Sequence, residues 1–338
     1  MKWMSKAFVW PFLLLICGCI TADIAVIELR TGEMRHPPYS GMRQVVVAVD
    51  RKAGTFKTMR RNGSLFAVRT FDAACRQVSE FNVPVFTEAY CGSTHYSLSD
   101  DGRRFVYLKD NTHNLYLLDV STGRETLLWE HVANTELEMP QLEWISESKV
   151  LVVLREYGRS DRRTNEVTIL DVATGDRKTI YSPVDPSSFD YSLSPDASLL
   201  AFQDASSRHD IQGVVKVLDV QKGTLRATLG DGHQLIGEPC WNPDGSELAY
   251  VEGRDLKIWT MTNNTTRTLR SFPERFTCYS VVFGNGVAGY IGSDKDSAKQ
   301  PLVILDSRNG SALRTIRARF NGGVFLLNGT TVVCEVGY

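Results

Sequence analysis

The chain has 338 residues, of which 43% are hydrophobic, and 38 Lys and Arg against 39 Asp and Glu give it a formal net charge of −1. A balance this close to neutral argues against a general nucleic-acid binder, which needs a basic surface to displace counterions from the phosphates. Seven four-stranded units of about 45 residues each would use nearly the whole chain, so a second domain is not expected.

Residues 1–19 have the features of a bacterial lipoprotein signal peptide. Two lysines precede an apolar stretch, residues 7–16, that is too short to cross a bilayer, which needs about 20 apolar residues. The stretch ends in Ile16-Cys17-Gly18-Cys19, which resembles a lipobox and implies lipidation of Cys19. We therefore expect an exported protein anchored by Cys19, in the outer membrane or another membrane facing the periplasm. Ordinary cleavage after Ala22, giving a soluble periplasmic or secreted protein, is the alternative.

An aspartate followed by a Thr-Gly-type turn recurs along the chain. The clearest copies are Asp119-Val-Ser-Thr-Gly123, Asp171-Val-Ala-Thr-Gly175 and Asp219-Val-Gln-Lys-Gly223. Weaker copies begin at Glu28, Asp72, Met261 and Asp306. A spacing of about 40–50 residues is typical of a propeller or solenoid built from one repeated supersecondary unit.

The strands expected in chain order fit four-stranded antiparallel units. Alternating or apolar runs predict strands at residues 24–28, 44–49, 65–71, 105–108, 115–118, 143–146, 150–154, 167–170, 199–202 and 214–218. Residues 238–271 give the clearest unit, with strands at 238–241, 247–251, 255–261 and 266–269 and a Pro-Asp-Gly turn after the first. The region 43–81 is the least regular. The sequence thus predicts one propeller blade per repeat.

The turn sequences carry a family resemblance. Ser194-Pro-Asp-Ala197, Asn242-Pro-Asp-Gly245 with the Ser-Glu-Leu-Ala-Tyr that follows it, and the trailing Asp-Val-x-x-Gly resemble the repeat of TolB-like (WD40-like) propellers, also found in prolyl-oligopeptidase relatives. The match is good over residues 94–310. It implies an all-β, seven-bladed propeller over residues 24–338 and implies nothing about the ligand. The chain lacks the α/β domain that precedes the propeller of TolB itself.

The ends of the chain predict how the ring closes. Residues 24–28 stand at a third-strand position with no first or second strand before them, whereas residues 324–327 and 330–335 supply two strands with nothing after them. Pairing the two ends would complete the seventh blade and remove exposed sheet edges.

The cysteines leave the disulfide pattern open. Without Cys17 and Cys19, five remain: Cys75, Cys91, Cys240, Cys278 and Cys334. Cys240 with Cys278, or Cys75 with Cys91, would be possible bridges in an oxidising compartment, and buried free thiols are the alternative. No Cys or His spacing indicates a metal site, and we expect no cofactor.

Connection lengths predict which face binds a ligand. We call the face with the connections between second and third strands, and between blades, the long-loop face, and the opposite face, with tight turns, the plain face. The expected long connections are residues 82–94, 130–140, 155–166, 181–190, 204–213 and 292–301. Function usually lies on long loops held by a rigid scaffold. Charged candidates there are Arg159, Asp161, Arg162, Arg163, Arg208, His209, Asp210, Asp231 and His233.

Other motifs indicate little chemistry. Gly284-Asn-Gly-Val-Ala-Gly289 matches a dinucleotide-binding pattern, but no helix is expected after it to receive a phosphate. No GxSxG nucleophile motif is present, and Asn-Gly pairs such as Asn309-Gly310 are typical of tight hairpin turns. We therefore expect no catalytic residues. The hypothesis is a noncatalytic, monomeric scaffold at the cell envelope that binds a protein or small ligand on the long-loop face and the membrane through a lipid. The alternative is a hydrolase, lyase or lactonase with a site at the mouth of the central channel.

Overall fold

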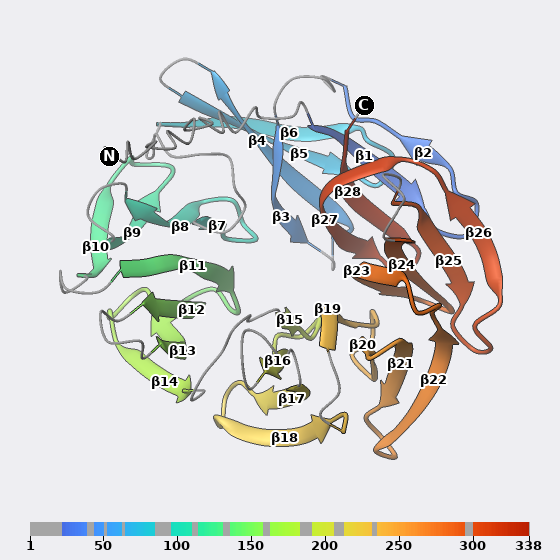
Figure 1. Cartoon of the computed structure of the whole chain (residues 1–338). Helices are drawn as coiled ribbons and strands as arrows, with labels where there is room; N and C mark the ends of the chain where they lie inside the picture. Colours follow the sequence, from blue (N-terminus) through green and yellow to red (C-terminus); the bar gives the residue numbers. More distant parts are fainter. Residues whose placement is uncertain are drawn as a thin grey trace, which may run out of the picture.

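The computed structural model describes residues 22–38, 44–50, 53–62, 65–84, 96–109, 114–130, 136–157, 163–182, 191–205, 213–231, 235–294 and 300–337. These residues form seven four-stranded antiparallel sheets and no helix. The sheets are arranged around a ring (Figure 1). The predicted fold, an all-β seven-bladed propeller, is confirmed.

Each blade takes four strands from the inside of the ring to the outside. Blade 1 consists of β3 (Val45–Asp50), β4 (Thr55–Asn62), β5 (Leu65–Asp72) and β6 (Gln77–Pro84). Blade 2 consists of β7 (Tyr96–Leu98), β8 (Arg104–Lys109), β9 (Asn114–Asp119) and β10 (Glu125–Trp129). Blade 3 consists of β11 (Glu136–Trp144), β12 (Lys149–Tyr157), β13 (Arg163–Asp171) and β14 (Arg177–Tyr181). Blade 4 consists of β15 (Tyr191–Leu193), β16 (Leu199–Ala205), β17 (Gly213–Asp219) and β18 (Thr224–Leu229).

The remaining blades follow the same order. Blade 5 consists of β19 (Leu235–Trp241), β20 (Glu247–Glu252), β21 (Asp255–Thr260) and β22 (Thr265–Ser271). Blade 6 consists of β23 (Phe276–Gly284), β24 (Val287–Asp294), β25 (Leu302–Asp306) and β26 (Ala312–Ile316). Blade 7 joins the two ends of the chain: β27 (Arg319–Asn328), β28 (Thr331–Gly337), β1 (Ala22–Glu28) and β2 (Met34–Arg35).

The ring closes as the sequence predicts. β1 pairs with β28 along its whole length, from Ala22 opposite Gly337 to Glu28 opposite Thr331. β1 therefore occupies the third-strand position, and β27 and β28 supply the first and second strands. One blade built from both ends joins the last blade to the first.

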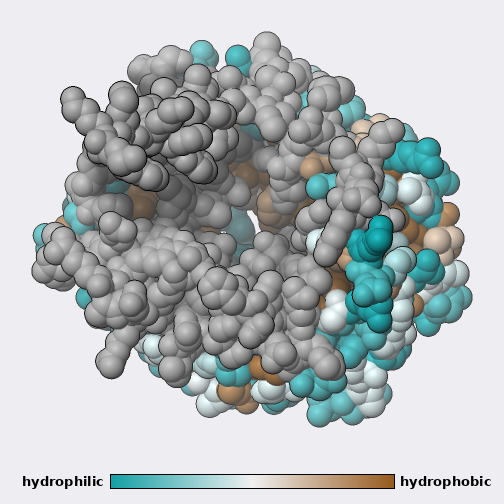
Figure 2. Space-filling model, in the orientation of Figure 1, coloured by the Kyte–Doolittle hydropathy of each residue, from teal (hydrophilic) through white to brown (hydrophobic). Residues whose placement is uncertain are grey.

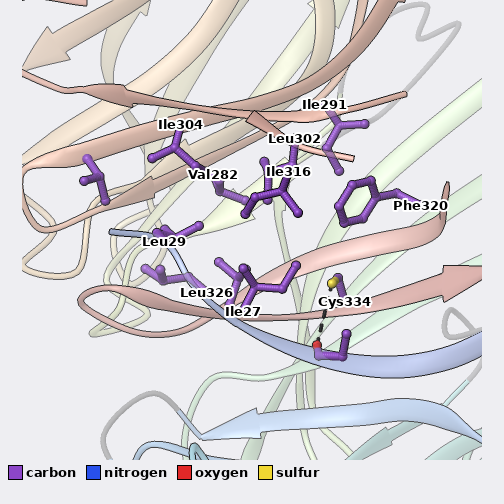
Figure 3. Close-up of a cluster of buried hydrophobic side chains, with 13 residues drawn as sticks. Ile27, Leu29, Val282, Ile291, Leu302, Ile304, Ile316, Phe320, Leu326 and Cys334 are labelled. Carbon is purple, nitrogen blue, oxygen red and sulfur yellow. Dashed lines mark hydrogen bonds between the residues drawn. The ribbon is translucent and has the colours of Figure 1, made fainter. Parts of the chain in front are cut away.

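The core lies between neighbouring blades. Figure 3 shows the cluster between blades 6 and 7, where Ile27 and Leu326 of blade 7 pack with Val282 and Ile304 of blade 6. In the same cluster the Cys334 thiol donates a weak hydrogen bond to the Ala25 carbonyl at 3.6 Å. Because each sheet buries both faces against its neighbours, the blades stabilise one another.

Two tryptophans add polar contacts between inner strands. The indole of Trp144 in β11 donates to the Ser97 carbonyl in blade 2 at 3.0 Å, and that of Trp241 in β19 donates to the Ser192 carbonyl in blade 4 at 3.1 Å. Trp241 is only 1% exposed. The indole N–H groups of both residues are thus satisfied by the preceding blade.

The repeated aspartates cap the turns between third and fourth strands. Asp119 Oδ1 accepts hydrogen bonds from the amides of Ser121 and Thr122, both at 2.9 Å. The glycine that ends the turn, Gly123, has a φ of 69°, which L-residues rarely adopt. This geometry explains why an aspartate and a glycine recur four residues apart.

In two of the weaker copies of the aspartate-turn motif, the left-handed residue lies one position earlier than the sequence predicts. In blade 1 the left-handed position is held by Cys75, with a φ of 61°, and not by Arg76. In blade 5 it is held by Asn264, with a φ of 54°, so the turn begins at Thr260 and not at Met261. Asparagine tolerates this conformation because its short side chain can hydrogen-bond locally; here Asn264 Oδ1 accepts from the Trp259 indole at 2.9 Å.

Acid should destabilise the fold through these caps. Hydrogen bonds from Ser121 and Thr122 lower the pKa of Asp119 to about 2, and those from Arg308 lower that of Asp306 to about 2. An unfolded aspartate has a pKa of about 3.9, so the unfolded chain binds protons first as pH falls. The stabilisation is therefore complete above about pH 5 and is lost as the pH falls towards 2.

Urea midpoints measured from pH 5 to pH 2 check this expectation. The unmodified protein should lose stability over that range, and Asp119→Asn should lose less of it because one capping carboxyl is gone. Glu147→Gln, which removes an exposed carboxyl outside these caps, serves as the control. An unchanged pH profile for Asp119→Asn would contradict the role given to the cap.

Several elements differ from those expected. The inner strand of blade 3 runs from Glu136 to Trp144, so residues 145–146 belong to the turn. Strands also extend into the expected loops 130–140, 155–166, 204–213 and 292–301, because strand pairing continues past the apolar residues that mark each strand. In blade 1 the sequence missed β4 and β6, whose polar composition hides the alternation.

Candidate functional site

Connection lengths distinguish the two faces of the ring. All fourteen connections between first and second strands, and between third and fourth, have two to five residues. On the long-loop face the connections reach eleven residues, with the longest at residues 36–44, 85–95 and 182–190. The longest blade-to-blade connections therefore join blade 7 to blade 1, blade 1 to blade 2, and blade 3 to blade 4. Figure 2 shows an opening near the centre of the ring.

On the plain face, basic side chains join neighbouring blades. Lys57 Nζ in blade 1 donates to the Asp100 carbonyl in blade 2 at 2.8 Å. Arg267 in blade 5 donates to the Ser307 carbonyl in blade 6 at 2.7 Å. Burial lowers the pKa of Lys57, although Asp50 and Asp100 oppose that shift. These residues serve the scaffold.

Most of the predicted site residues lie outside the described residues. These are Cys19, Arg159, Asp161, Arg162, Arg208, His209, Asp210 and His233. Arg163 is the first residue of β13 and pairs with Tyr157. Asp231 is exposed after β18, on the long-loop face as expected. The structure thus places the backbone of two of the candidates on adjacent blades, Arg163 on blade 3 and Asp231 after blade 4.

A cluster of three polar side chains ties blade 3 to blade 4 on this face. Tyr181, the last residue of β14, donates its hydroxyl proton to Asp204 Oδ2 at 3.1 Å. Lys216 Nζ donates to the Tyr181 hydroxyl at 2.8 Å and forms an ion pair with Asp204. Burial raises the pKa of Tyr181. Burial alone would lower the pKa of Lys216, but its bonds to Asp204 and Tyr181 raise it overall.

This cluster holds the base of two candidate connections. Residues 182–190 follow Tyr181 directly, and residues 206–212, which contain Arg208, His209 and Asp210, begin two residues after Asp204. The three side chains are half-buried and satisfy one another. They hold together the strand ends from which the two connections start, and the geometry gives none of them a separate chemical role.

An equivalent cluster ties blade 4 to blade 5. Glu252, with a side chain only 1% exposed, accepts from Lys257 Nζ at 2.7 Å and from the Asp231 amide at 2.7 Å. The bond to Glu252 raises the pKa of Lys257. A Cβ on Gly230, whose φ is +95°, would lie 2.5 Å from Glu252 Oε1. The carboxylate therefore fixes the backbone at Gly230 and Asp231, where the connection between blades 4 and 5 begins.

Removing Lys257 should reveal the cost of leaving the Glu252 carboxylate unpaired. We expect Lys257→Met to destabilise the fold by about 2 kcal/mol, because a buried charge loses its partner while the aliphatic stem is kept. Urea unfolding measures the change. Lys222→Met is the matched control, since Lys222 is 70% exposed and its pair with Asp219 is on the surface. Similar effects for the two variants would contradict this role of Lys257.

None of the five side chains in these two clusters was predicted from the sequence: Tyr181, Asp204, Lys216, Glu252 and Lys257. A signal for the lysines was present: Lys216 pairs with Phe202 and Lys257 with Tyr250, so both occupy the same position of the third strand. Aligning the repeats by their turns would have shown a lysine repeated at a half-buried position.

Four of the cysteines are thiols and form no disulfide bridge in the structure. They are Cys75, Cys240, Cys278 and Cys334, so of the alternatives that the sequence left open, the structure has no Cys240–Cys278 bridge and none from Cys75. Cys91 itself lies outside the described residues. Burial raises the pKa of Cys75 to about 11 and that of Cys278 to about 12, which makes both thiols poor nucleophiles.

Three further features bear on the chemistry of the chain. Within the described ranges, no three His, Cys, Asp or Glu side chains come together in a way that would hold a metal ion. The Gly284–Gly289 motif is a tight hairpin between β23 and β24, as the sequence analysis expected. No helix among the described residues is long and apolar enough to cross a membrane.

Comparison with solved structures gives the class of fold. An oligogalacturonate lyase in complex with manganese superposes with a TM-score of 0.57 at 16% identity, covering 94% of this chain and 96% of that one. A TolB protein from Agrobacterium tumefaciens superposes with a TM-score of 0.51 at 11% identity, covering 94% and 98%. The chain therefore has the β-propeller fold of TolB-like proteins, shared with oligogalacturonate lyases.

Sequence comparison gives a shorter match. Dipeptidyl peptidase 4 from Arthroderma otae is 27% identical over 111 residues, which are 31% of this chain. The match spans 14% of the length of that relative. No family model matches the chain. The sequence similarity therefore covers about a third of this chain and a small part of that relative.

Proposed function

We propose that the protein is a noncatalytic binding scaffold of the bacterial cell envelope, which holds a protein or small ligand on its long-loop face. The observation that supports this most is the difference between faces: the plain face has only short turns, whereas the other carries connections of up to eleven residues. The polar clusters around Asp204 and Glu252 hold the bases of those connections. A rigid ring with elaborated loops on one side is suited to recognition.

Site-specific crosslinking tests which face binds. A photoreactive amino acid at Asp231, exposed on the long-loop face, should give a discrete adduct in cells. The same amino acid at Ser121, exposed in a plain-face turn, is the control and should give none. Adducts of the same kind and yield from both positions would reject the long-loop face as the binding face.

The anchor is part of the same proposal. Lipidation of Cys19 would hold the ring at a membrane, with only residues 20–21 before β1. Mass spectrometry of the mature N-terminal peptide tests it. A diacylglyceryl group on Cys19 is expected, and a free N-terminus at Asp23 would reject the anchor in favour of a soluble exported protein.

The second candidate is an enzyme, specifically a lyase acting on an acidic oligosaccharide. The similarity to oligogalacturonate lyase favours it, because that protein and this chain match over nearly their whole lengths, with no further domain needed. The test is incubation with oligogalacturonate, with and without manganese, while the absorbance of an unsaturated product is followed. Turnover would overturn the noncatalytic proposal.

A further inference from the structure

Both ends of the described chain lie on the long-loop face. β1 is the third strand of its blade, and third strands run from the long-loop face towards the plain face. Ala22, at the start of β1, pairs with Gly337 at the end of β28. The residues before Ala22, Cys19 among them, therefore join the ring on the face that carries the long connections.

Basic residues gather around this point. On the long-loop ends of blades 5, 6, 7 and 1, the strands and short connections carry five arginines whose side chains the structure describes: Arg60, Arg254, Arg270, Arg275 and Arg317. Arg254, Arg270 and Arg317 are exposed. Leu65, at the start of β5 on the same face, is also 40% exposed.

Three carboxylates of the same sector already have a polar partner. Glu252 is buried and paired with Lys257, and Asp23 is buried at 2% exposure beside His36 at 3.2 Å. Asp255 accepts from the Ser271 hydroxyl at 2.6 Å. Glu274 is exposed, and Asp294 and Glu335 lie at the long-loop ends of their strands. Among the described side chains of this sector, the exposed arginines therefore outnumber the exposed carboxylates.

The opposite sector has the reverse balance. Among the side chains described at the long-loop ends of blades 2 to 4, the acidic Glu130 and Asp231 are exposed. The two lysines described there, Lys109 and Lys216, each form an ion pair, with Glu125 and Asp204. Within the described residues, the exposed charge of the long-loop face is thus basic on one side of the ring and acidic on the other, although the net charge of the chain is only −1.

We propose that the basic sector, defined by Arg60, Arg254, Arg270, Arg275 and Arg317, docks on a lipid surface with anionic headgroups. The inference deepens the proposed envelope location and rests on it. Clustered arginines are attracted to anionic headgroups over about a Debye length, and the N-terminus emerges within this sector. The acidic sector, which includes the connection at residues 182–190, would then stay open to a ligand.

Vesicle binding tests the surface without the lipid anchor. The full chain carrying Cys19→Ser is purified from the exported fraction and sedimented with vesicles of phosphatidylglycerol or of phosphatidylcholine. It should bind the anionic vesicles, and more weakly as salt rises. The triple variant Arg254→Glu, Arg270→Glu, Arg317→Glu should bind them roughly tenfold more weakly or worse.

A matched triple variant on the plain face controls for net charge. Arg76→Glu, Arg103→Glu, Arg124→Glu makes the same charge change at exposed arginines and should bind as the parent does. Equal losses in both triple variants, or no binding to anionic vesicles at low salt, would overturn the docking surface. Neither result depends on the lipid at Cys19 or on crosslinking from Asp231. The docking surface can therefore be rejected while the proposed binding function stands, and the reverse.

Discussion

A chain that lacks residues 324–338 should show no cooperative thermal unfolding. The deletion removes β28 and half of β27, and with them all seven pairs that join β28 to β1. It also removes Leu326, Val332, Val333 and Cys334, each no more than 3% exposed. At about 1.5–3 kcal/mol for each buried aliphatic side chain, the loss is of the order of the whole stability of a domain.

The loss of stability should exceed the sum of the contributions of the deleted side chains, because the ring would open. Without β27 and β28, β1 has no inner partner, and the faces of blades 6 and 1 that pack on blade 7 become exposed. Calorimetry and binding of a hydrophobic dye measure the outcome: a broad transition and strong dye binding are expected. Adding a peptide of residues 319–338 should restore a sharp transition. A truncated protein that melts sharply at the parent temperature would show that the closure is unimportant.

The closure could be predicted because it depends on order along the chain. The sequence predicts no strand before residues 24–28 and none after residues 324–335, so a ring of four-stranded blades leaves these segments only each other to pair with. The turns could be predicted for a local reason, since an aspartate cap and a left-handed residue need only a few residues of sequence. β6 has Gln, Ser, Glu and Asn among its eight residues, and only its pairing with β5 identifies it as a strand.

The site was harder to predict because its contacts join different blades. Glu252 meets the amide of Asp231, 21 residues away on the preceding blade, and nothing in either local sequence indicates that pairing. The candidate residues on the long connections follow no repeated pattern. The sequence could therefore indicate which face is elaborated, while the residues that position the connections came from the structure.

The same distinction between local and inter-blade contacts predicts different results for two glycines that look alike in sequence. Gly175 and Gly310 both end a turn after a capping aspartate, with φ values of 79° and 73°. An added Cβ at Gly175 meets nothing within 4 Å, whereas at Gly310 it would lie 1.9 Å from the Leu269 carbonyl oxygen of blade 5. Gly175→Ala should therefore cost about 1 kcal/mol, the strain of a left-handed alanine.

Gly310→Ala should cost about 3 kcal/mol or more, because backbone of one blade must move away from its neighbour. The Arg267 bond to the Ser307 carbonyl, at 2.7 Å in the same junction, would weaken as the blades separate. Urea unfolding of both variants gives the comparison, with Gly175→Ala as the matched control for φ strain. If both variants lose the same stability, the close approach of blades 5 and 6 does not restrict the size of the residue at position 310. If they differ as expected, a glycine of this repeat has two separable roles: a backbone conformation set by the turn, and a lack of volume required by the next blade.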